Sequence, residues 1–302
     1  MTHRLCIIGF GEAGAIFGAA LTSHVPVRSY DILQGTPAFT KKAAQFTGSG
    51  IEFAVSAAEA AQGAQIVLSL VTAAASLDVA REAATYLKPG QIFLDFNSVS
   101  PGTKKASAAV IERSGAAYVD GAIMAPVPSR ALAVPILLAG SHAASVVNGL
   151  CGYGMNLEVV ADQVGIAAAT KMCRSIIIKG IEALCSEAFL AARAHGVESR
   201  VLASLNDTFP GTDWNKYAGH QVGRSLVHGR RRAAEMREVA TTVREAGLEP
   251  LMAMATALRQ DWAADLSDGS PALKKRHDDE WLETLDLILA AGAGDHVRAT
   301  GT

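Results

Sequence analysis

The pattern of apolar and polar positions divides the chain into two parts. From residue 4 to about 160, short apolar runs rich in β-branched residues alternate with longer alanine-rich segments. Strands separated by helix-length segments predict a doubly wound, mostly parallel sheet. The predicted strands are Leu5–Gly9, Val27–Asp31, Glu52–Val55, Ile66–Val71, Ile92–Phe96, Tyr118–Ala122, Ile136–Ala139 and Leu157–Val160.

After about residue 162 the strand pattern ends and helical patterns follow. Gly165 to His195 forms one long, mostly apolar pattern that stops at Gly196, and glycine is favoured just beyond a helix end. Further helices are predicted near Val201–Thr208, Arg230–Ala246, Pro250–Ala264 and Asp278–Ala291. We therefore expect an α/β domain over residues 1–162 and an all-helical domain over 163–302, joined by a long helix at about 164–195.

Composition and charge narrow the classes of function. No apolar run approaches the roughly 20 residues that span a bilayer, and a net charge of −2 gives no general electrostatic reason to bind nucleic acid. The N-terminus runs directly into a strand without a signal-peptide pattern, so we expect a cytoplasmic protein. The four cysteines are scattered without metal-ligand spacing, so we expect reduced thiols and no metal site.

A glycine-rich loop follows the first predicted strand. Gly9, Gly11 and Gly14 form a G-x-G-x-x-G motif before a helical segment, where glycines permit a tight turn, close approach of a pyrophosphate and close helix packing. The alternative is that these glycines only build a tight strand-to-helix turn. In this context the motif indicates a Rossmann-type dinucleotide site, with the candidate cofactor-binding residues Gly9, Phe10, Gly11, Glu12, Ala13 and Gly14.

The cofactor type depends on the end of the second strand. Asp31 stands there, about 20 residues after the loop, where an acidic side chain binds the adenosine ribose hydroxyls. Its charge repels a 2′-phosphate and favours NAD. NADP stays open, because Arg28 and Lys41 or Lys42 could supply positive charge.

The long helix carries a polar stripe. Lys171, Arg174, Ser175, Lys179 and Glu182 recur at helical spacing, whereas Ile176, Ile177, Ile181 and Leu184 are apolar. An ordinary exposed stripe is one interpretation. The segment is too apolar for a fully exposed helix. We therefore expect these polar side chains to face a functional site.

Together these blocks resemble the β-hydroxyacid dehydrogenase family, which includes 3-hydroxyisobutyrate dehydrogenase and is related to 6-phosphogluconate dehydrogenase. Beyond the glycine loop, the resemblance rests on Ile66–Thr72, Leu94–Pro101 and Gly165–Gly196. It implies that Lys171 is the catalytic acid or base and that the helical half forms a dimer. It also implies that Val71 and Thr72 lie along the dinucleotide and that Asn97 and Ser98 lie near the nicotinamide. Asn97 and Ser98 could also cap a helix before Pro101, and the two roles can coexist.

Two departures from the family pattern concern the substrate. Ser175 stands where the family usually has an asparagine beside the reacting group, and the segment after Asp120 runs through Met124 in place of the family's carboxylate-binding loop. We expect Met124 and Arg174 near the substrate. Arg231 or Arg232 could replace the missing anion clamp, because a guanidinium holds a carboxylate bidentately, or both could belong to an exposed basic helix.

The expected function is hydride transfer between a small hydroxy acid, or a related alcohol, and NAD or NADP, with Lys171 and Ser175 as catalytic residues. As the hydride leaves, a partly desolvated lysine accepts the hydroxyl proton. Two alternatives stay open: a ketone or imine reductase acting on a substrate without a carboxylate, and a catalytically silent NAD(P)-binding regulator.

Overall fold

The computed structural model describes residues 4–274 and 280–299 and divides into two compact units. Unit 1 contains residues 1–172 and unit 2 contains residues 173–302. The division falls inside helix α7 (Ile166–Ala194), ten residues after the boundary expected from the sequence. The first turns of α7, with Lys171, therefore belong to unit 1.

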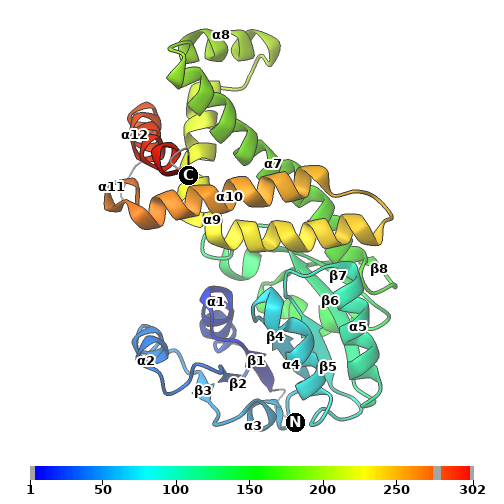
Figure 1. Cartoon of the computed structure of the whole chain (residues 1–302). Helices are drawn as coiled ribbons and strands as arrows, with labels where there is room; N and C mark the ends of the chain where they lie inside the picture. The colour runs from blue at the N-terminus through cyan, green and yellow to red at the C-terminus, as the bar shows by residue number, and fades with distance from the viewer. Residues whose placement is uncertain (1–3, 275–279, 300–302) are drawn as a thin grey trace. The chain divides into compact units, whose positions relative to one another are not determined.

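Unit 1 contains one eight-stranded sheet with the order β3-β2-β1-β4-β5-β6-β7-β8 (Figure 1). All eight predicted strands are present, and all neighbours are parallel except β6 and β7. The order of the first six strands is that of a Rossmann fold. The strands are β1 (Leu5–Ile8), β2 (Val27–Tyr30), β3 (Glu52–Phe53), β4 (Ile66–Ser69), β5 (Ile92–Asp95), β6 (Ala117–Ile123), β7 (Pro135–Ala139) and β8 (Asn156–Ala161).

Helices cover both faces of this sheet, which explains its nearly continuous apolar strands. In β1, Leu5 and Ile7 pack into one core cluster, whereas Cys6 and Ile8 pack into another. The antiparallel pairing of β7 follows from its short connection to β6, since a parallel partner needs a crossover of a dozen or more residues. The helices of unit 1 before α7 are α1 (Glu12–Leu21), α2 (Pro37–Ala44), α3 (Ala57–Ala61), α4 (Ser76–Ala83), α5 (Pro101–Glu112) and α6 (Ala143–Leu150).

In the described residues of unit 2, helices joined by short loops are the regular secondary structure. The unit contains the rest of α7 and the helices α8 (Glu198–Thr208), α9 (Trp214–Glu245), α10 (Leu251–Gly269), α11 (Pro271–Lys274) and α12 (Trp281–Ala299). Helix α9 begins 16 residues before the predicted start at Arg230, and the Asp213 carboxylate caps it by accepting from the Lys216 N–H. One glycine inside α9 explains the difference: a Cβ on Gly229 would lie 2.5 Å from the Gln260 carbonyl oxygen, so this glycine permits close packing of α9 on α10.

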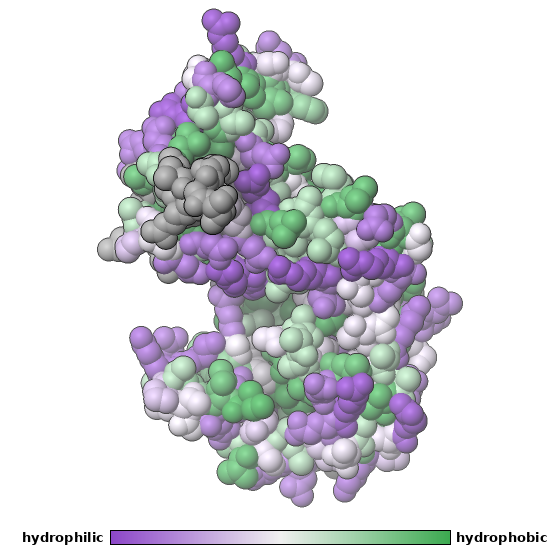
Figure 2. Space-filling model, in the orientation of Figure 1, coloured by the Kyte–Doolittle hydropathy of each residue, from purple (hydrophilic) through white to green (hydrophobic). Residues whose placement is uncertain are grey.

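The surface is mixed in character. On the face drawn in Figure 2, hydrophobic and hydrophilic residues are interspersed over both units. Within the residues that the structure describes, no helix has the length and apolar character needed to cross a bilayer.

Candidate active site

The glycine loop has the geometry that a dinucleotide requires. Gly9 has φ +100°, and a Cβ on it would lie 2.4 Å from the Leu70 carbonyl oxygen. A Cβ on Gly14 would lie 2.0 Å from the Gly9 carbonyl oxygen, so the turn itself requires both residues to be glycine. A Cβ on Gly11, at the N-cap of α1, would meet no atom within 4 Å. The fold therefore does not demand glycine at Gly11, but open space at an uncapped helix N-terminus suits a pyrophosphate.

Asp31 is held at the edge of this loop. One carboxylate oxygen accepts the Phe10 N–H at 2.6 Å and the other accepts the Leu33 N–H at 2.8 Å. Each carboxylate oxygen has two lone pairs, so capacity for further donors remains on both. Asp31 is half-buried and thus oriented by the backbone while still reachable by ribose hydroxyls.

The other predicted loop residues have different environments. The Phe10 ring is buried and packs edge-on against Phe53, with ring centroids 4.9 Å apart, so it serves the core and only its backbone borders the loop. Glu12 is exposed at the start of α1, and Ala13 is half-buried. These features allow the backbone of residues 10–13 to face a ligand.

Asn97 ties together the ends of β4 and β5. Its Oδ1 accepts the Val71 N–H at 2.7 Å, and its Nδ2 donates to Ser69 Oγ at 2.9 Å and to Ser76 Oγ at 3.1 Å. Both amide hydrogens and the carbonyl of this buried side chain are thus engaged inside the protein. Asn97 fixes the path of Val71, while Thr72 lies exposed beyond it.

The alternative role of Asn97 and Ser98 as helix caps is wrong. Ser100 is the N-cap of α5, and its Oγ accepts the Thr103 N–H at 3.2 Å. Pro101 occupies the first helical position, where proline needs no hydrogen-bond partner. Ser100, and neither Asn97 nor Ser98, therefore caps α5.

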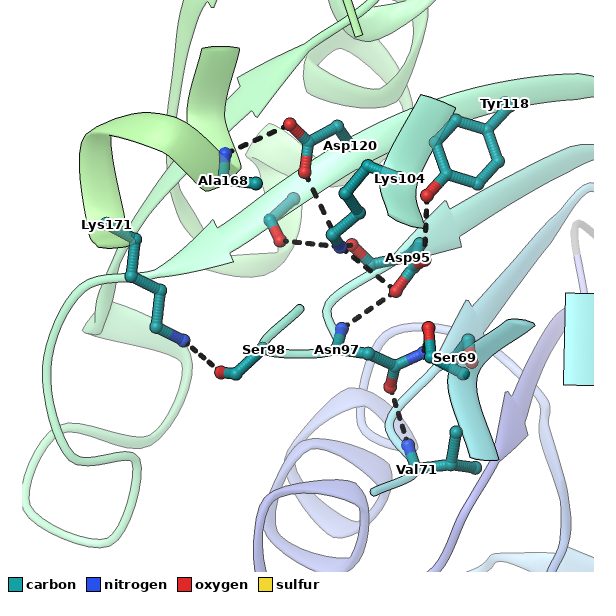
Figure 3. A network of polar contacts seen from close by, with 12 residues as sticks. Ser69, Val71, Asp95, Asn97, Ser98, Lys104, Tyr118, Asp120, Ala168 and Lys171 are labelled. Atoms are coloured by element: carbon teal, nitrogen blue, oxygen red, sulfur yellow. Dashed lines mark hydrogen bonds and ion pairs between the residues drawn. The ribbon is translucent and has the colours of Figure 1, made fainter. Parts of the chain in front are cut away.

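Lys171 and Ser98 meet in unit 1 although 73 residues separate them in sequence (Figure 3). The Lys171 Nζ donates to Ser98 Oγ at 2.6 Å, and both side chains are half-buried. Ser98 directly follows Asn97, which holds the end of β4. The structure thus joins the predicted lysine to the predicted loop at the carboxyl end of the sheet, where Rossmann folds bind their ligands.

Beside this contact lies a buried ionic group that sequence reasoning missed. Lys104 Nζ lies 3.0 Å from Asp95 Oδ1 and 3.4 Å from Asp120 Oδ1, and all three side chains are fully buried. The Tyr118 hydroxyl donates to Asp95 Oδ2 at 2.7 Å, and burial together with the Asp95 charge raises the pKa of Tyr118 well above its ordinary value. A signal was available: Lys104 shares the buried stripe of α5 with Ser107, Ala108 and Ile111.

The predicted substrate residues are distributed over both units. Met124 is half-buried after β6, and its N–H donates to the Pro135 carbonyl. On α7, Arg174 is exposed and Ser175, one turn after Lys171, is buried. In unit 2, Arg231 is exposed and pairs with Glu235, whereas Arg232 is buried.

Arg232 belongs to a buried ionic group of unit 2. Its Nη1 donates to Glu182 Oε1 at 2.7 Å and lies 2.6 Å from Oε2. Arg224 Nε lies 3.2 Å from Glu182 Oε1, and the Gln260 amide donates to Glu182 Oε2 at 3.2 Å. Burial raises the pKa of Glu182, and the two guanidiniums oppose that rise. The Arg232 guanidinium is thus occupied by a carboxylate of its own chain.

Lys179 is also buried, so it does not belong to an exposed polar stripe. Its Nζ pairs with Glu235 at 2.9 Å, and burial lowers its pKa despite the Glu235 charge. The polar residues Ser175, Lys179 and Glu182 are therefore inside, while Ile177 and Leu184 of the same helix are 63% and 58% exposed.

Comparison with known proteins follows this division of the chain. Residues 4–146 match the family model of the NAD binding domain of 6-phosphogluconate dehydrogenase, and residues 192–263 match a domain of unknown function, DUF1932. A conserved hypothetical protein from Sinorhizobium meliloti is 36% identical, with a TM-score of 0.76, and the match covers 94% of this chain and 96% of that one.

Two further solved structures extend this comparison. A conserved protein of unknown function, described as structurally similar to 3-hydroxyacid dehydrogenases, is 32% identical, with a TM-score of 0.70 over 87% of this chain and 97% of that one. The 3-hydroxyisobutyrate dehydrogenase of Mycobacterium tuberculosis shares the fold at 18% identity, with a TM-score of 0.66 over 94% of this chain and 99% of that one.

Proposed function

Because this chain belongs to the family of hydroxyacid dehydrogenase-like proteins with a 6-phosphogluconate dehydrogenase-type NAD-binding domain, we propose that it is an NAD-dependent dehydrogenase acting on a CH–OH group. The substrate class is a small hydroxy acid or a related alcohol. The contact of Lys171 with Ser98 carries this proposal, because it supplies a proton-transfer group beside the predicted nicotinamide-binding loop.

The cofactor preference is argued from Asp31. Its two oxygens are oriented by backbone N–H groups and keep lone pairs for ribose hydroxyls, whereas a 2′-phosphate would meet a negative charge. Ile32 and Leu33, the next two residues, are exposed and carry no charge that would attract a phosphate. NAD is therefore favoured over NADP.

Lys171 performs the proton transfer in this proposal. The bound cofactor supplies a nicotinamide ring that takes the hydride from the carbinol carbon or returns it. As that C–H bond breaks, the neutral Lys171 amine accepts the hydroxyl proton, and in the reverse direction the ammonium gives a proton to the carbonyl oxygen. Ser98 Oγ orients the Nζ, and Ser175 provides a hydroxyl one turn further along α7.

The anion of a hydroxy-acid substrate needs a positive group. Arg232 is held by Glu182 and Arg231 by Glu235, so neither guanidinium is presented without a competing carboxylate. Arg174 is exposed three residues after Lys171, on a neighbouring position of the same helix surface. We favour Arg174 over Arg231 and Arg232 for this role.

A ketone or imine reductase is the second candidate, and the β6 backbone favours it. Residues 120–123 pair with β7 in an antiparallel ladder, and the Met124 N–H donates to Pro135. These groups are thus engaged and the Met124 side chain adds apolar surface. A carboxylate held at this segment, as in the wider family, is correspondingly disfavoured.

We also propose a homodimer formed through unit 2. Large apolar side chains are exposed on three of its helices: Ile177 of α7 is 63% exposed, Val227 of α9 61% and Leu258 of α10 64%. An interface that covered these three side chains would remove their apolar surface from water, which stabilises association.

The test uses purified protein, NAD and a panel of hydroxy acids, alcohols, ketones and imines. We expect turnover of at least one substrate, and we expect Lys171→Ala to lower kcat by about 10²–10⁴-fold while the Kd for NAD stays unchanged. Lys88→Ala is the matched control, because Lys88 is exposed. Cofactor binding without turnover across the panel would indicate a silent regulator and contradict the proposal.

A further inference from the structure

Two buried carboxylates lie side by side at the end of the sheet. Asp95 and Asp120 are register partners on the parallel strands β5 and β6, and both are fully buried. Lys104 of α5 places its ammonium between them, and its Nζ also donates to the Asp95 carbonyl oxygen at 2.6 Å (Figure 3). Burying such charges costs several kcal/mol per ion, and an apolar trio of similar volume is often as stable. Stability alone is therefore a weak reason for this group.

One carboxylate binds the helix that carries Lys171, and the other binds the loop that carries Ser98. Asp120 Oδ2 accepts the Gly165 N–H at 3.1 Å and the Ala168 N–H at 3.0 Å, so it fixes the start of α7, the helix that carries Lys171. Asp95 Oδ1 accepts the Asn97 N–H at 2.8 Å, so it fixes the loop that carries Ser98. Lys104 forms an ion pair with both carboxylates.

These contacts form a closed path. It runs from Lys171 along α7 to Asp120, through Lys104 to Asp95, along the loop to Ser98, and back to Lys171. Without the ammonium, two adjacent carboxylates would repel each other, and either one of them takes up a proton or they move apart. A protonated carboxyl is a weaker acceptor for the backbone N–H groups that Asp120 and Asp95 hold, and a displaced carboxylate moves those groups with it. Both responses therefore loosen or shift the start of α7 or the loop.

We infer that Lys104 is a positioning residue that sets the place of the Lys171 amine through Asp120 and Asp95. This inference rests on the proposed function of Lys171. Lys104 does not touch the reacting atoms. A misplacement of about 1 Å at a catalytic group can cost about 10²-fold in rate, so the effect of Lys104 is measurable although it acts through other residues.

The experiment compares Lys104→Met with Lys105→Met. Methionine is unbranched and close to lysine in size but carries no charge, and Lys105 is the exposed neighbour on the same helix. We expect Lys104→Met to lower kcat by about 10–10²-fold, with the Kd for NAD and the KM of the substrate changed by less than about 3-fold. Lys105→Met is expected to behave like the wild type.

A second readout does not depend on turnover. Lysines are labelled by reductive methylation with ¹³C, and the Lys171 signal is assigned by its loss in Lys171→Arg. In Lys104→Met we expect the titration midpoint of Lys171 to move by at least about 0.5 pH unit, while the Lys88 signal is unchanged. If Lys104→Met is too unstable, Lys104→Met/Asp120→Asn removes one of the two adjacent charges and with it their repulsion. This double variant is expected to recover stability without recovering the wild-type Lys171 midpoint.

The outcomes separate this inference from the proposed function. A folded Lys104→Met with wild-type kcat and an unmoved Lys171 midpoint overturns the inference alone. Wild-type turnover in Lys171→Ala overturns the proposed function, and the inference is then supported only if the Lys171 midpoint still moves in Lys104→Met. Recovery of both stability and the wild-type midpoint in the double variant would show that Lys104 serves stability only.

Discussion

Removing the Glu182 carboxylate perturbs a buried ion pair of unit 2. Glu182 of α7 is fully buried and contacts Arg232 and Arg224 of α9 and Gln260 of α10. In Glu182→Ala, the guanidinium of Arg232, a residue that is only 3% exposed, is left without its Glu182 partner. Breaking one partner of a buried pair costs about 3–5 kcal/mol, because an uncompensated charge remains inside.

A surface pair on the same helix gives the matched control. Glu187 pairs with Arg259, and their side chains are 68% and 27% exposed. Exposed pairs contribute about 0–1 kcal/mol, so Glu187→Ala is expected to lower the free energy of unfolding by less than about 1 kcal/mol. The contrast between the two alanine variants isolates the effect of burial.

Urea unfolding followed by tryptophan fluorescence measures the free energy of unfolding of unit 2 in each variant. All three tryptophans, Trp214, Trp262 and Trp281, lie in unit 2. Replacing both charges in Glu182→Leu/Arg232→Met is expected to recover at least about half of the loss, since an apolar pair of similar size carries no desolvation penalty. Equal, small losses in Glu182→Ala and Glu187→Ala would refute the reasoning.

Two further predictions concern the cofactor and assembly. Asp31→Ser is expected to reduce the ratio of NAD to NADP affinity by at least about 10-fold, because it removes a charge-assisted acceptor for the ribose. Calorimetric titration of both cofactors measures this ratio. An unchanged ratio would mean that Asp31 does not select the cofactor. Light scattering is expected to give twice the 31.4 kDa of one chain. A single-chain mass at micromolar concentration would contradict the proposed dimer.

The architecture of unit 1 could be predicted because both of its signals are local. Strand runs such as Ile66–Ser69 are short, apolar and bounded by turn residues, and alternation with helices fixes a parallel sheet. The glycine loop was also predictable, since its motif follows β1 directly. The start of α9 was missed because glycines such as Gly229 indicate a break locally, whereas their contact with α10 is a tertiary property.

The arginine run at 230–232 shows why the site was harder to predict. Successive helical positions point about 100° apart, so neighbours in sequence reach different partners. Arg230 pairs with Asp265 at 2.7 Å, Arg231 pairs with Glu235, and Arg232 pairs with buried Glu182. Nothing in the sequence pairs Arg232 with a residue 50 positions earlier.

The same limit applies to the partners of Lys104. Two consecutive lysines, Lys104 and Lys105, are typical of a solvated surface, yet one is buried and the other exposed. The carboxylates that pair with Lys104 come from β5 and β6, which lie side by side only in the folded sheet. The contact of Lys171 with Ser98 is likewise long-range, and the sequence supplied the two residues without their distance.

A crystal structure with NAD bound tests the central claim most directly, through the distance between Lys171 Nζ and carbon 4 of the nicotinamide ring. The account predicts that the ring lies beside the Ser98 loop, with the Nζ close enough for one small substrate to contact both. A ring bound elsewhere, or a Lys171 amine directed away from it into solvent, would contradict the account.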